Sequence, residues 1–177
     1  LDLADLAAVD AFCDELAARE ERIDVLVLNA GVVPLEARPT VQGFELMFGV
    51  NYLANVWMVE RMLELGLLGT DSSRDDAQGR APFLPRIVAV SSESHRAQGP
   101  FDQGRLGEFQ SYGGMGGMKV YGQTKYLLNT WAAELARQLQ RDGEVDISVH
   151  SLCPGAVNTG IAREAPAMVQ PLLSWVM

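Results

Sequence analysis

The chain has 177 residues, of which 48% are hydrophobic and 21% charged, a composition typical of one soluble globular domain. Its formal net charge of −9 disfavours binding to nucleic acid or anionic lipid, because phosphate groups repel an acidic surface. No apolar run is long enough to span a bilayer, and the first residues do not resemble a signal peptide. Two widely spaced cysteines give neither a disulfide framework nor a metal-binding motif, so we expect a cytoplasmic protein without a metal site.

Helix-like and strand-like patterns alternate along the chain. We expect a helix over 3–16, a strand over 23–28, a helix over 43–65, a strand over 86–90, a helix over 119–140 and a strand over 145–152. Asp2 is the expected N-cap of the first helix. The strand over 23–28 is almost wholly apolar, which predicts cover on both faces. This alternation predicts an α/β fold with a parallel sheet.

Small or polar residues follow each predicted strand: Asn29-Ala30-Gly31, Ser91-Ser92 and Pro154-Gly155. In open α/β sheets, ligands bind in the crevice outside the carboxyl ends of the strands. An ordinary turn explains any one of these segments alone. Their succession favours the interpretation that they line a binding crevice.

Tyr121 and Lys125 lie four residues apart, and therefore on one face of a predicted helix. A phenol has a pKa near ~10, and a neighbouring ammonium lowers that pKa toward the range that acid–base catalysis requires. We therefore expect a lowered pKa for Tyr121. The alternative is an exposed aromatic ring beside a surface lysine. Ser92, at the end of the preceding strand, could hydrogen-bond a substrate oxygen.

Asn51 lies within a predicted helix between apolar neighbours, where an amide is either a satisfied core residue or has a function. The long interval from Ser92 to Tyr121 contains the glycine-rich segment 113–117. Two interpretations stay open for this interval: a flexible loop beside the substrate, or a disordered surface insertion.

Five motifs share an order and context that resembles the short-chain dehydrogenase/reductase family. They are Asn29-Ala30-Gly31, Asn51 within 48–53, Ser92 after 88–91, Tyr121-x-x-x-Lys125, and Pro154-Gly155-x-x-x-Thr159. The segments around 43–45 and 50–53 are most similar to the branch that contains retinol-dehydrogenase-like enzymes and fungal relatives. The resemblance covers nearly the whole chain and implies a Rossmann-like, doubly wound parallel sheet.

The resemblance also implies a catalytic role for each of four residues. Tyr121 would be the general acid/base, and Lys125 would lower its pKa and hold the nicotinamide ribose. Ser92 would orient the substrate oxygen, and Asn51 would help to order a water behind Lys125. The substrate would be a small alcohol, ketone or aldehyde.

The same resemblance implies a binding site for NAD or NADP, a choice that the sequence does not settle. The residues near the adenosine would be Asp2, Asn29, Ala30 and Gly31. The residues near the nicotinamide would be Pro154, Gly155, Val157 and Thr159, together with Tyr121 and Lys125. Two positions depart from the family pattern, Ala54 for glycine and Cys153 for histidine.

The family's glycine-rich pyrophosphate turn is not found among these 177 residues, and the segment 113–117 does not follow a strand as such a turn would. We expect a single partial domain over 1–177, truncated at both ends and lacking its first two strands. If 23–28 is the third strand of the order 3-2-1-4-5-6, it has no neighbour left in the sheet. We therefore expect the chain to fold poorly alone.

The leading hypothesis is an NAD(P)-dependent oxidoreductase that interconverts an alcohol and a ketone or aldehyde. The alternative is a truncated form or pseudoenzyme that keeps the site residues without binding dinucleotide. A third interpretation is an interaction module, because the helices over 43–65 and 119–140 resemble those that form the family's dimer interface. Trp57 and Trp131, on these helices, are predicted to be core residues.

Overall fold

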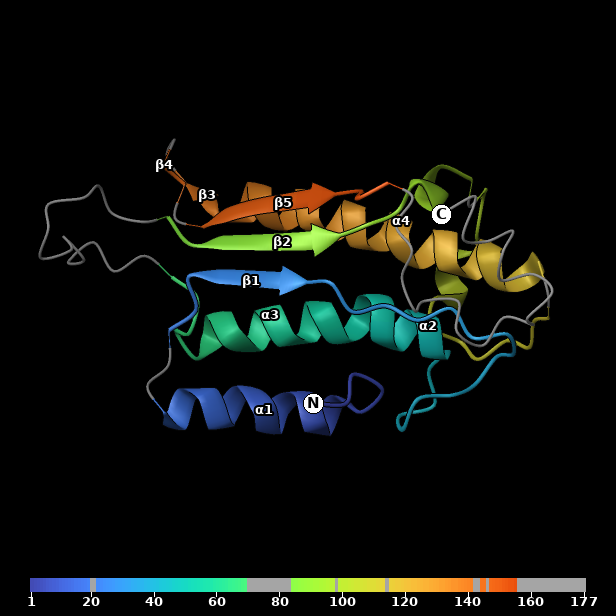
Figure 1. Cartoon of the computed structure of the whole chain (residues 1–177), viewed down its shortest axis with the longest axis horizontal. Coiled ribbons are helices and arrows are strands. Elements are labelled where there is room, and N and C mark those ends of the chain that lie inside the picture. The colour runs from blue at the N-terminus through green and yellow to red at the C-terminus, as the bar shows by residue number, and fades with distance from the viewer. Residues whose placement is uncertain are drawn as a thin grey trace, which may run out of the picture.

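The chain folds as a parallel three-stranded sheet with helices (Figure 1). The computed structural model describes residues 1–19, 22–69, 84–97, 99–113, 115–141, 144–145 and 147–155. The helices are α1 (Leu6–Ala18), α2 (Leu46–Phe48), the π-helical turn η1 (Gly49–Leu53), α3 (Ala54–Glu64), the 3₁₀ turns η2 (Glu93–Ala97) and η3 (Gln103–Arg105), and α4 (Met115–Gln138). The strands are β1 (Val25–Leu28), β2 (Arg86–Val90), β3 (Gln140–Arg141), β4 (Glu144–Val145) and β5 (Ser148–Leu152). The alternation confirms the predicted α/β class.

The strand over 23–28 does have a neighbour, so the prediction that it stands alone is wrong. The order in the sheet is β1-β2-β5, and β1 pairs with β2 in parallel from Val25↔Arg86 to Leu28↔Ala89. Successive strands that lie side by side match positions four, five and six of the order 3-2-1-4-5-6. β1 therefore does not take the place of the third strand, because the strand that follows the third in the chain is not its neighbour.

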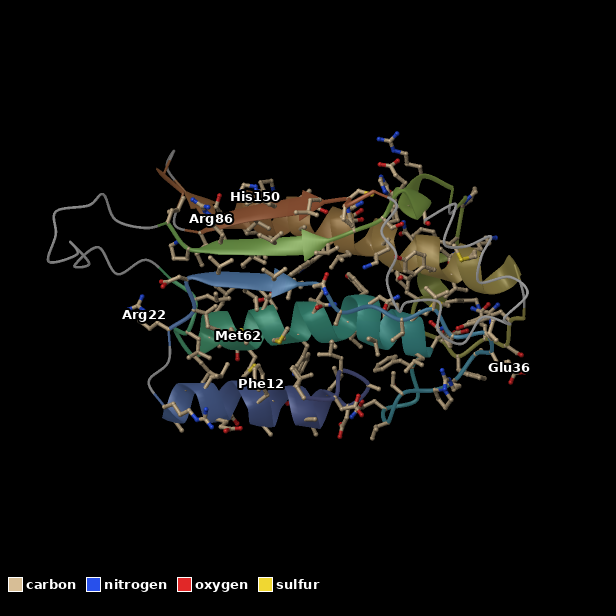
Figure 2. All side chains as sticks on the ribbon, viewed as in Figure 1. Phe12, Arg22, Glu36, Met62, Arg86 and His150 are labelled. Atoms are coloured by element: carbon tan, nitrogen blue, oxygen red, sulfur yellow. The ribbon has the colours of Figure 1, made fainter. Side chains whose placement is uncertain are left out.

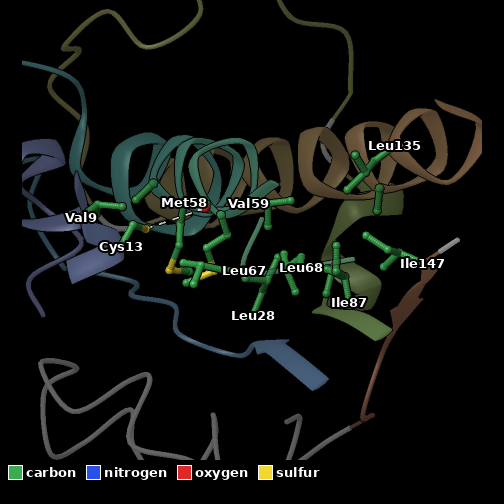
Figure 3. Packing of buried hydrophobic residues seen from close by; sticks show 14 of the residues in the cluster. Val9, Cys13, Leu28, Met58, Val59, Leu67, Leu68, Ile87, Leu135 and Ile147 are labelled. Carbon is green, nitrogen blue, oxygen red and sulfur yellow. Dashed lines mark hydrogen bonds between the residues drawn. The ribbon is translucent and has the colours of Figure 1, made fainter. Parts of the chain in front are cut away.

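A single apolar core joins the sheet to α1, α3 and α4 (Figure 3). Val9 of α1, Val59 of α3 and Ile87 of β2 are fully buried in it. Phe12 and Met62 lie in the space between α1 and α3 (Figure 2), and both belong to this cluster or pack against it. The helices are thereby held against the strands by burial of apolar surface.

β1 is covered on one face only, which corrects the prediction of cover on both faces. Leu28 is buried, whereas Val25 and Val27 are 49% and 53% exposed. Alternate residues of a strand point to opposite sides of the sheet, so the two valines share one face. Within the described part of the chain, that face carries exposed apolar surface.

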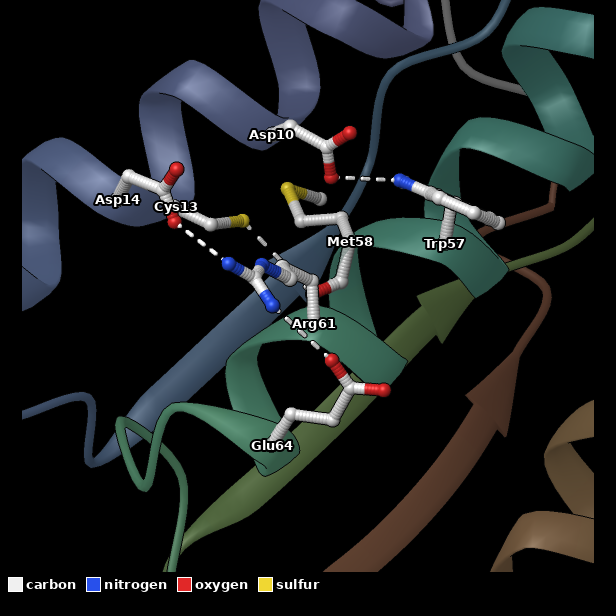
Figure 4. A network of polar contacts seen from close by, with 7 residues as sticks. All are labelled: Asp10, Cys13, Asp14, Trp57, Met58, Arg61 and Glu64. Atoms are coloured by element: carbon white, nitrogen blue, oxygen red, sulfur yellow. Dashed lines mark hydrogen bonds and ion pairs between the residues drawn. The ribbon is translucent and has the colours of Figure 1, made fainter.

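Polar contacts add to the packing of α1 against α3 (Figure 4). Trp57 Nε1 donates a hydrogen bond to Asp10 Oδ1 at 2.8 Å, and Arg61 bridges Asp14 at 2.9 Å and Glu64 at 3.1 Å. Trp57 is 45% exposed, so its predicted core position is wrong, whereas Trp131 packs against the core. Exposed ion pairs of this kind stabilise little.

The first helix begins later than expected, and Asp5 rather than Asp2 is its N-cap. The Asp5 side chain accepts a hydrogen bond from the Ala7 N–H at 3.0 Å, from an extended backbone conformation. Asp2 instead accepts from the Ala4 N–H at 2.9 Å. Each aspartate side chain accepts a hydrogen bond from the N–H two residues further along the chain. The spacing of apolar residues therefore did not distinguish which of the two is the N-cap.

Candidate active site

The carboxyl ends of β1, β2 and β5 point the same way, toward the amino-terminal half of α4 (Figure 1). Ser92 follows β2, and Tyr121 lies within hydrogen-bonding reach of its side chain. Cys153, just beyond β5, is close enough to act electrostatically on the same phenol. The structure therefore brings the ends of two strands together around Tyr121.

Lys125 is buried beneath these strand ends, with 3% of its surface exposed. Its Nζ donates a hydrogen bond to the Val90 carbonyl at 2.8 Å and lies 5.8 Å from the centre of the Tyr121 ring. Burial lowers the Lys125 pKa to about 8, because an ammonium loses hydration in the interior. An exposed surface lysine, the alternative weighed from the sequence, is thus excluded.

Tyr121 is also buried, and its pKa moves in the direction opposite to the sequence expectation. Removal from water raises the pKa of the phenol, the hydrogen bond with Ser92 opposes that rise, and Cys153 adds to it. The predicted lowering by Lys125 is wrong for this arrangement, because the ammonium is directed at the Val90 carbonyl. The phenol is therefore held in its protonated form at neutral pH.

Asn51 is fully buried in the π-helical turn η1. Its Nδ2 donates to the Val32 carbonyl at 3.0 Å and its Oδ1 accepts from the Val32 N–H at 2.8 Å. A third contact joins Nδ2 to Thr124 Oγ1 of α4 at 3.4 Å. Asn51 therefore fixes the segment that follows β1 against the helix that carries Tyr121.

The residues expected around a dinucleotide lie at the surface of the strand ends. Asn29, Ala30, Pro154 and Gly155 are exposed. A β-carbon on Gly31 would lie 3.5 Å from Asn51 Oδ1 and 3.6 Å from Lys125 Nζ, so this glycine adjoins the buried residues. Asp2 is exposed in the segment before α1, where its side chain accepts from the Ala4 N–H and its carbonyl accepts from the Asp5 N–H. Val157 and Thr159 lie outside the described residues.

The interval before Tyr121 is bound to the rest of the molecule, which disfavours a disordered insertion. We call residues 99–113 the strap. The Gly107 carbonyl accepts from the Glu45 N–H at 3.2 Å, and the Tyr112 hydroxyl donates to Glu45 Oε1 at 2.9 Å. Helix α4 begins at Met115 rather than 119, so the last part of the glycine-rich segment is helical.

A cavity of about 310 Å³ lies between the strap and α4. Glu45 and Phe48 line it from one side, and Lys119 and Thr124 line it from α4. Ser92, Tyr121 and Lys125 do not line it. This cavity is therefore separate from the candidate catalytic residues.

The sequence analysis assigned no individual role to three buried polar residues near the site, although it placed one of them, Ser91, in the predicted crevice. They are Glu45, Ser91 and Thr124. Thr124 Oγ1 donates to the Tyr121 carbonyl at 2.8 Å, and Ser91 Oγ has no hydrogen-bond partner among the described residues. A polar residue directly beside a proposed catalytic one, as Thr124 and Ser91 are, was the available signal.

Two negative findings apply to the described ranges alone. No group of three or more His, Cys, Asp and Glu side chains gathers there as a metal site requires. No helix there is both long and apolar enough to cross a membrane.

Comparison with known proteins identifies the family. Residues 1–100 match the family model described as short chain dehydrogenase. Retinol dehydrogenase 14 of Homo sapiens is 36% identical over 178 residues, which cover 99% of this chain and 47% of that protein, so the chain spans about half the length of that relative.

Solved structures share the fold. An uncharacterized protein from Mycobacterium paratuberculosis superposes with a TM-score of 0.67 at 26% identity, over 99% of this chain and 56% of that one. A short chain dehydrogenase of Shigella flexneri complexed with NADP gives a TM-score of 0.58 at 20% identity, over 99% of this chain and 66% of that one. The family match extends over more than half of the residues, and the chain belongs to the short chain dehydrogenase family.

Proposed function

We propose that the protein containing this chain interconverts an alcohol and a ketone or aldehyde, by hydride transfer with NAD or NADP. The observation that carries the proposal is the buried pair of Tyr121 and Lys125, with Lys125 Nζ 5.8 Å from the centre of the Tyr121 ring, on the helix that faces the carboxyl ends of the strands. Membership in the family and the likeness to human Retinol dehydrogenase 14 support it.

The chemistry assigned to the chain's own residues is movement of one proton at the Tyr121 hydroxyl. Because burial keeps this phenol protonated, it is prepared to donate a proton to a carbonyl oxygen, with Ser92 accepting or donating a hydrogen bond beside it. Lys125 Nζ lies 5.8 Å from the centre of the same ring and donates to the Val90 carbonyl, so it holds a positive charge near the phenol.

The strand ends fit a nicotinamide dinucleotide, which when bound supplies or accepts the hydride. Ala30 and Gly155 are exposed and have little or no side chain, and no atom of the described residues lies within 4 Å of a β-carbon placed on Gly155. Their backbone is therefore accessible to a large flat ligand. Asn29 and Pro154 would flank that ligand, and Asp2, Val157 and Thr159 stay predictions for the same site.

The test is Tyr121→Phe in the full-length protein, assayed for reduction of a panel of ketones and aldehydes with NADH and NADPH. Loss of the proton donor should lower kcat at least about 100-fold and leave the Kd for the dinucleotide within about threefold. Tyr126→Phe is the matched control, because Tyr126 lies on the same helix and is 39% exposed. Near-normal turnover by Tyr121→Phe would disprove the assignment.

A dinucleotide titration separates an enzyme from a protein that keeps the site residues without binding cofactor. NADH and NADPH are titrated into the full-length protein, with energy transfer from tryptophan to the nicotinamide as the signal. Saturable transfer supports the enzyme and also distinguishes NAD from NADP by affinity. Absence of transfer with both dinucleotides supports the alternative.

A cytoplasmic location and a homo-oligomer through the helices over 43–65 and 119–140 stay predictions. The exposed side chain of Trp57 lies on the first of these helices and is available to such an interface. Sedimentation of the full-length protein would test the oligomer.

A further inference from the structure

We propose that Glu45 is a positioning residue that joins the two helical segments bearing the candidate catalytic residues. This inference rests on the proposed function. Glu45 precedes α2 and η1, which carries Asn51, and it is 3% exposed. A carboxylate this buried requires hydrogen-bond donors on both oxygens. Both donors are present, and they come from different parts of the chain.

The first oxygen of Glu45 caps the helical run that leads to Asn51. Glu45 Oε2 accepts from the Phe48 N–H at 2.8 Å, as an N-cap side chain does. The Glu45 carbonyl accepts from the Gly49 N–H at 2.8 Å, at the first residue of η1. The Glu45 side chain thus caps α2, the helix that leads directly into the π-helical turn.

The second oxygen reaches the strap and, through it, the start of α4. Glu45 Oε1 accepts from the Tyr112 hydroxyl at 2.9 Å. The Tyr112 side chain packs on the first turn of α4, where a β-carbon on Gly116 or Gly117 would lie 3.2 Å from its atoms. Tyr112 is therefore held between the Glu45 carboxylate and the helix turn that precedes Tyr121.

The strap is also pressed against Phe48 beside Glu45. Gly107 has a φ of +77°, and a β-carbon there would lie 2.6 Å from Phe48 Cε1. The Glu45 N–H donates to the Gly107 carbonyl in the same place. Backbone and side chain of Glu45 thus hold two points of the strap. We call Glu45, its Tyr112 partner and its Phe48 N–H contact the Glu45 clamp.

The clamp explains why glycines occupy the first turn of α4. Glycine costs a helix about 1 kcal/mol relative to alanine, so Gly116 and Gly117 weaken the first turn of α4. The Tyr112 ring needs the space that their missing side chains leave. A helix start that is weak by sequence therefore depends on Tyr112, and through it on Glu45, for its position.

The experiment compares Tyr112→Phe, Glu45→Gln and Tyr126→Phe in the full-length protein. Tyr112→Phe removes only the hydroxyl that reaches Glu45 and leaves the cap on Phe48 intact. It should lower kcat/KM for the carbonyl substrate about tenfold, the net worth of one hydrogen bond, and shift the pH profile of kcat. Glu45→Gln retains one side-chain oxygen as an acceptor, so it should lower kcat/KM less than Tyr112→Phe does. Tyr126→Phe should change neither quantity.

A second readout does not need turnover. Amide hydrogen exchange over 115–121 should accelerate in Tyr112→Phe, and exchange over 49–53 should accelerate as well in Glu45→Ala. The proposal is overturned if these variants only lower the melting temperature and leave kinetics, pH profile and exchange unchanged. The Glu45 clamp would then contribute to stability alone. If the wild-type protein reduces no carbonyl with either dinucleotide, the proposed function fails, and the exchange result alone decides on the clamp.

Discussion

The two halves of the candidate site are held in different ways. Asn51, Tyr121 and Lys125 are buried, and each is bonded to, or packed on, another segment of the chain. Asn29 and Pro154, at the strand ends, are exposed. The half assigned to proton chemistry is thus preorganised by this chain's own contacts. The half assigned to the dinucleotide is an open surface that a ligand can approach.

The largest expected contrast between the halves comes from two asparagine substitutions. Asn51→Leu leaves the part-buried Val32 N–H and carbonyl without their side-chain partner, which should cost about 4 kcal/mol of unfolding free energy. Asn29→Ala, at the exposed strand end, should stay within about 0.5 kcal/mol. Urea denaturation measures both. Equal losses would remove the distinction between the halves.

Lys125 should give the buried half a characteristic dependence of stability on pH. The unfolded chain keeps this proton up to pH 10.5, whereas the folded chain releases it near pH 8. Between those values the unfolded state binds more protons, so the unfolding free energy rises with pH, by at most about 3 kcal/mol. Below pH 8 this group adds no slope.

Denaturation midpoints measured at intervals between these pH values test the prediction. Lys125→Met should flatten the rise, and Lys119→Met, at an exposed position on the same helix, should preserve it. A rise that survives in Lys125→Met would show that another group is responsible.

Gly49→Ala should sharpen the comparison by straining the buried half alone. A β-carbon at this position would lie 2.4 Å from Thr40 Cγ2, and the overpacking should cost about 2 kcal/mol. Thr40→Ser removes that methyl group and keeps the hydroxyl that accepts from the Phe44 N–H, so it should rescue the variant. Gly69→Ala is the control, because no atom of the described part of the chain lies within 4 Å of a β-carbon at that position. Thermal melts of all four proteins would show whether the clash exists.

The smallest effect is expected for Trp57→Phe, outside both halves. It removes the 2.8 Å hydrogen bond to Asp10 from an exposed place between α1 and α3. The loss should be below about 1 kcal/mol, and substrate kinetics should not change. A change in kcat would mean that the packing of α1 on α3 reaches the candidate site.

Local sequence patterns predicted much of this molecule. The apolar runs gave β1 and β2, and the four-residue spacing of Tyr121 and Lys125 placed both on one helix face. Burial patterns inside the helices followed from the 3.6-residue period. These features depend on neighbours in the chain, which is why they could be predicted.

Features that depend on tertiary contacts could not be predicted in the same way. The direction of the Tyr121 pKa depends on how deeply α4 is buried and on where the Lys125 ammonium points. The partner of β1 depends on which position of the sheet it takes. Glutamate is not a preferred N-cap, so Glu45 carried no signal until Tyr112 was seen beside it.

The uncovered side of β1 also has a consequence for the behaviour of the chain in solution. Val25 and Val27 form a small exposed apolar surface that favours self-association, whereas electrostatic repulsion from a formal charge of −9 opposes it. Added salt shortens the range of that repulsion to about 10 Å at 0.1 M. Preparations of this chain should therefore remain dispersed at low ionic strength and self-associate as salt is raised, the reverse of ordinary salting-in.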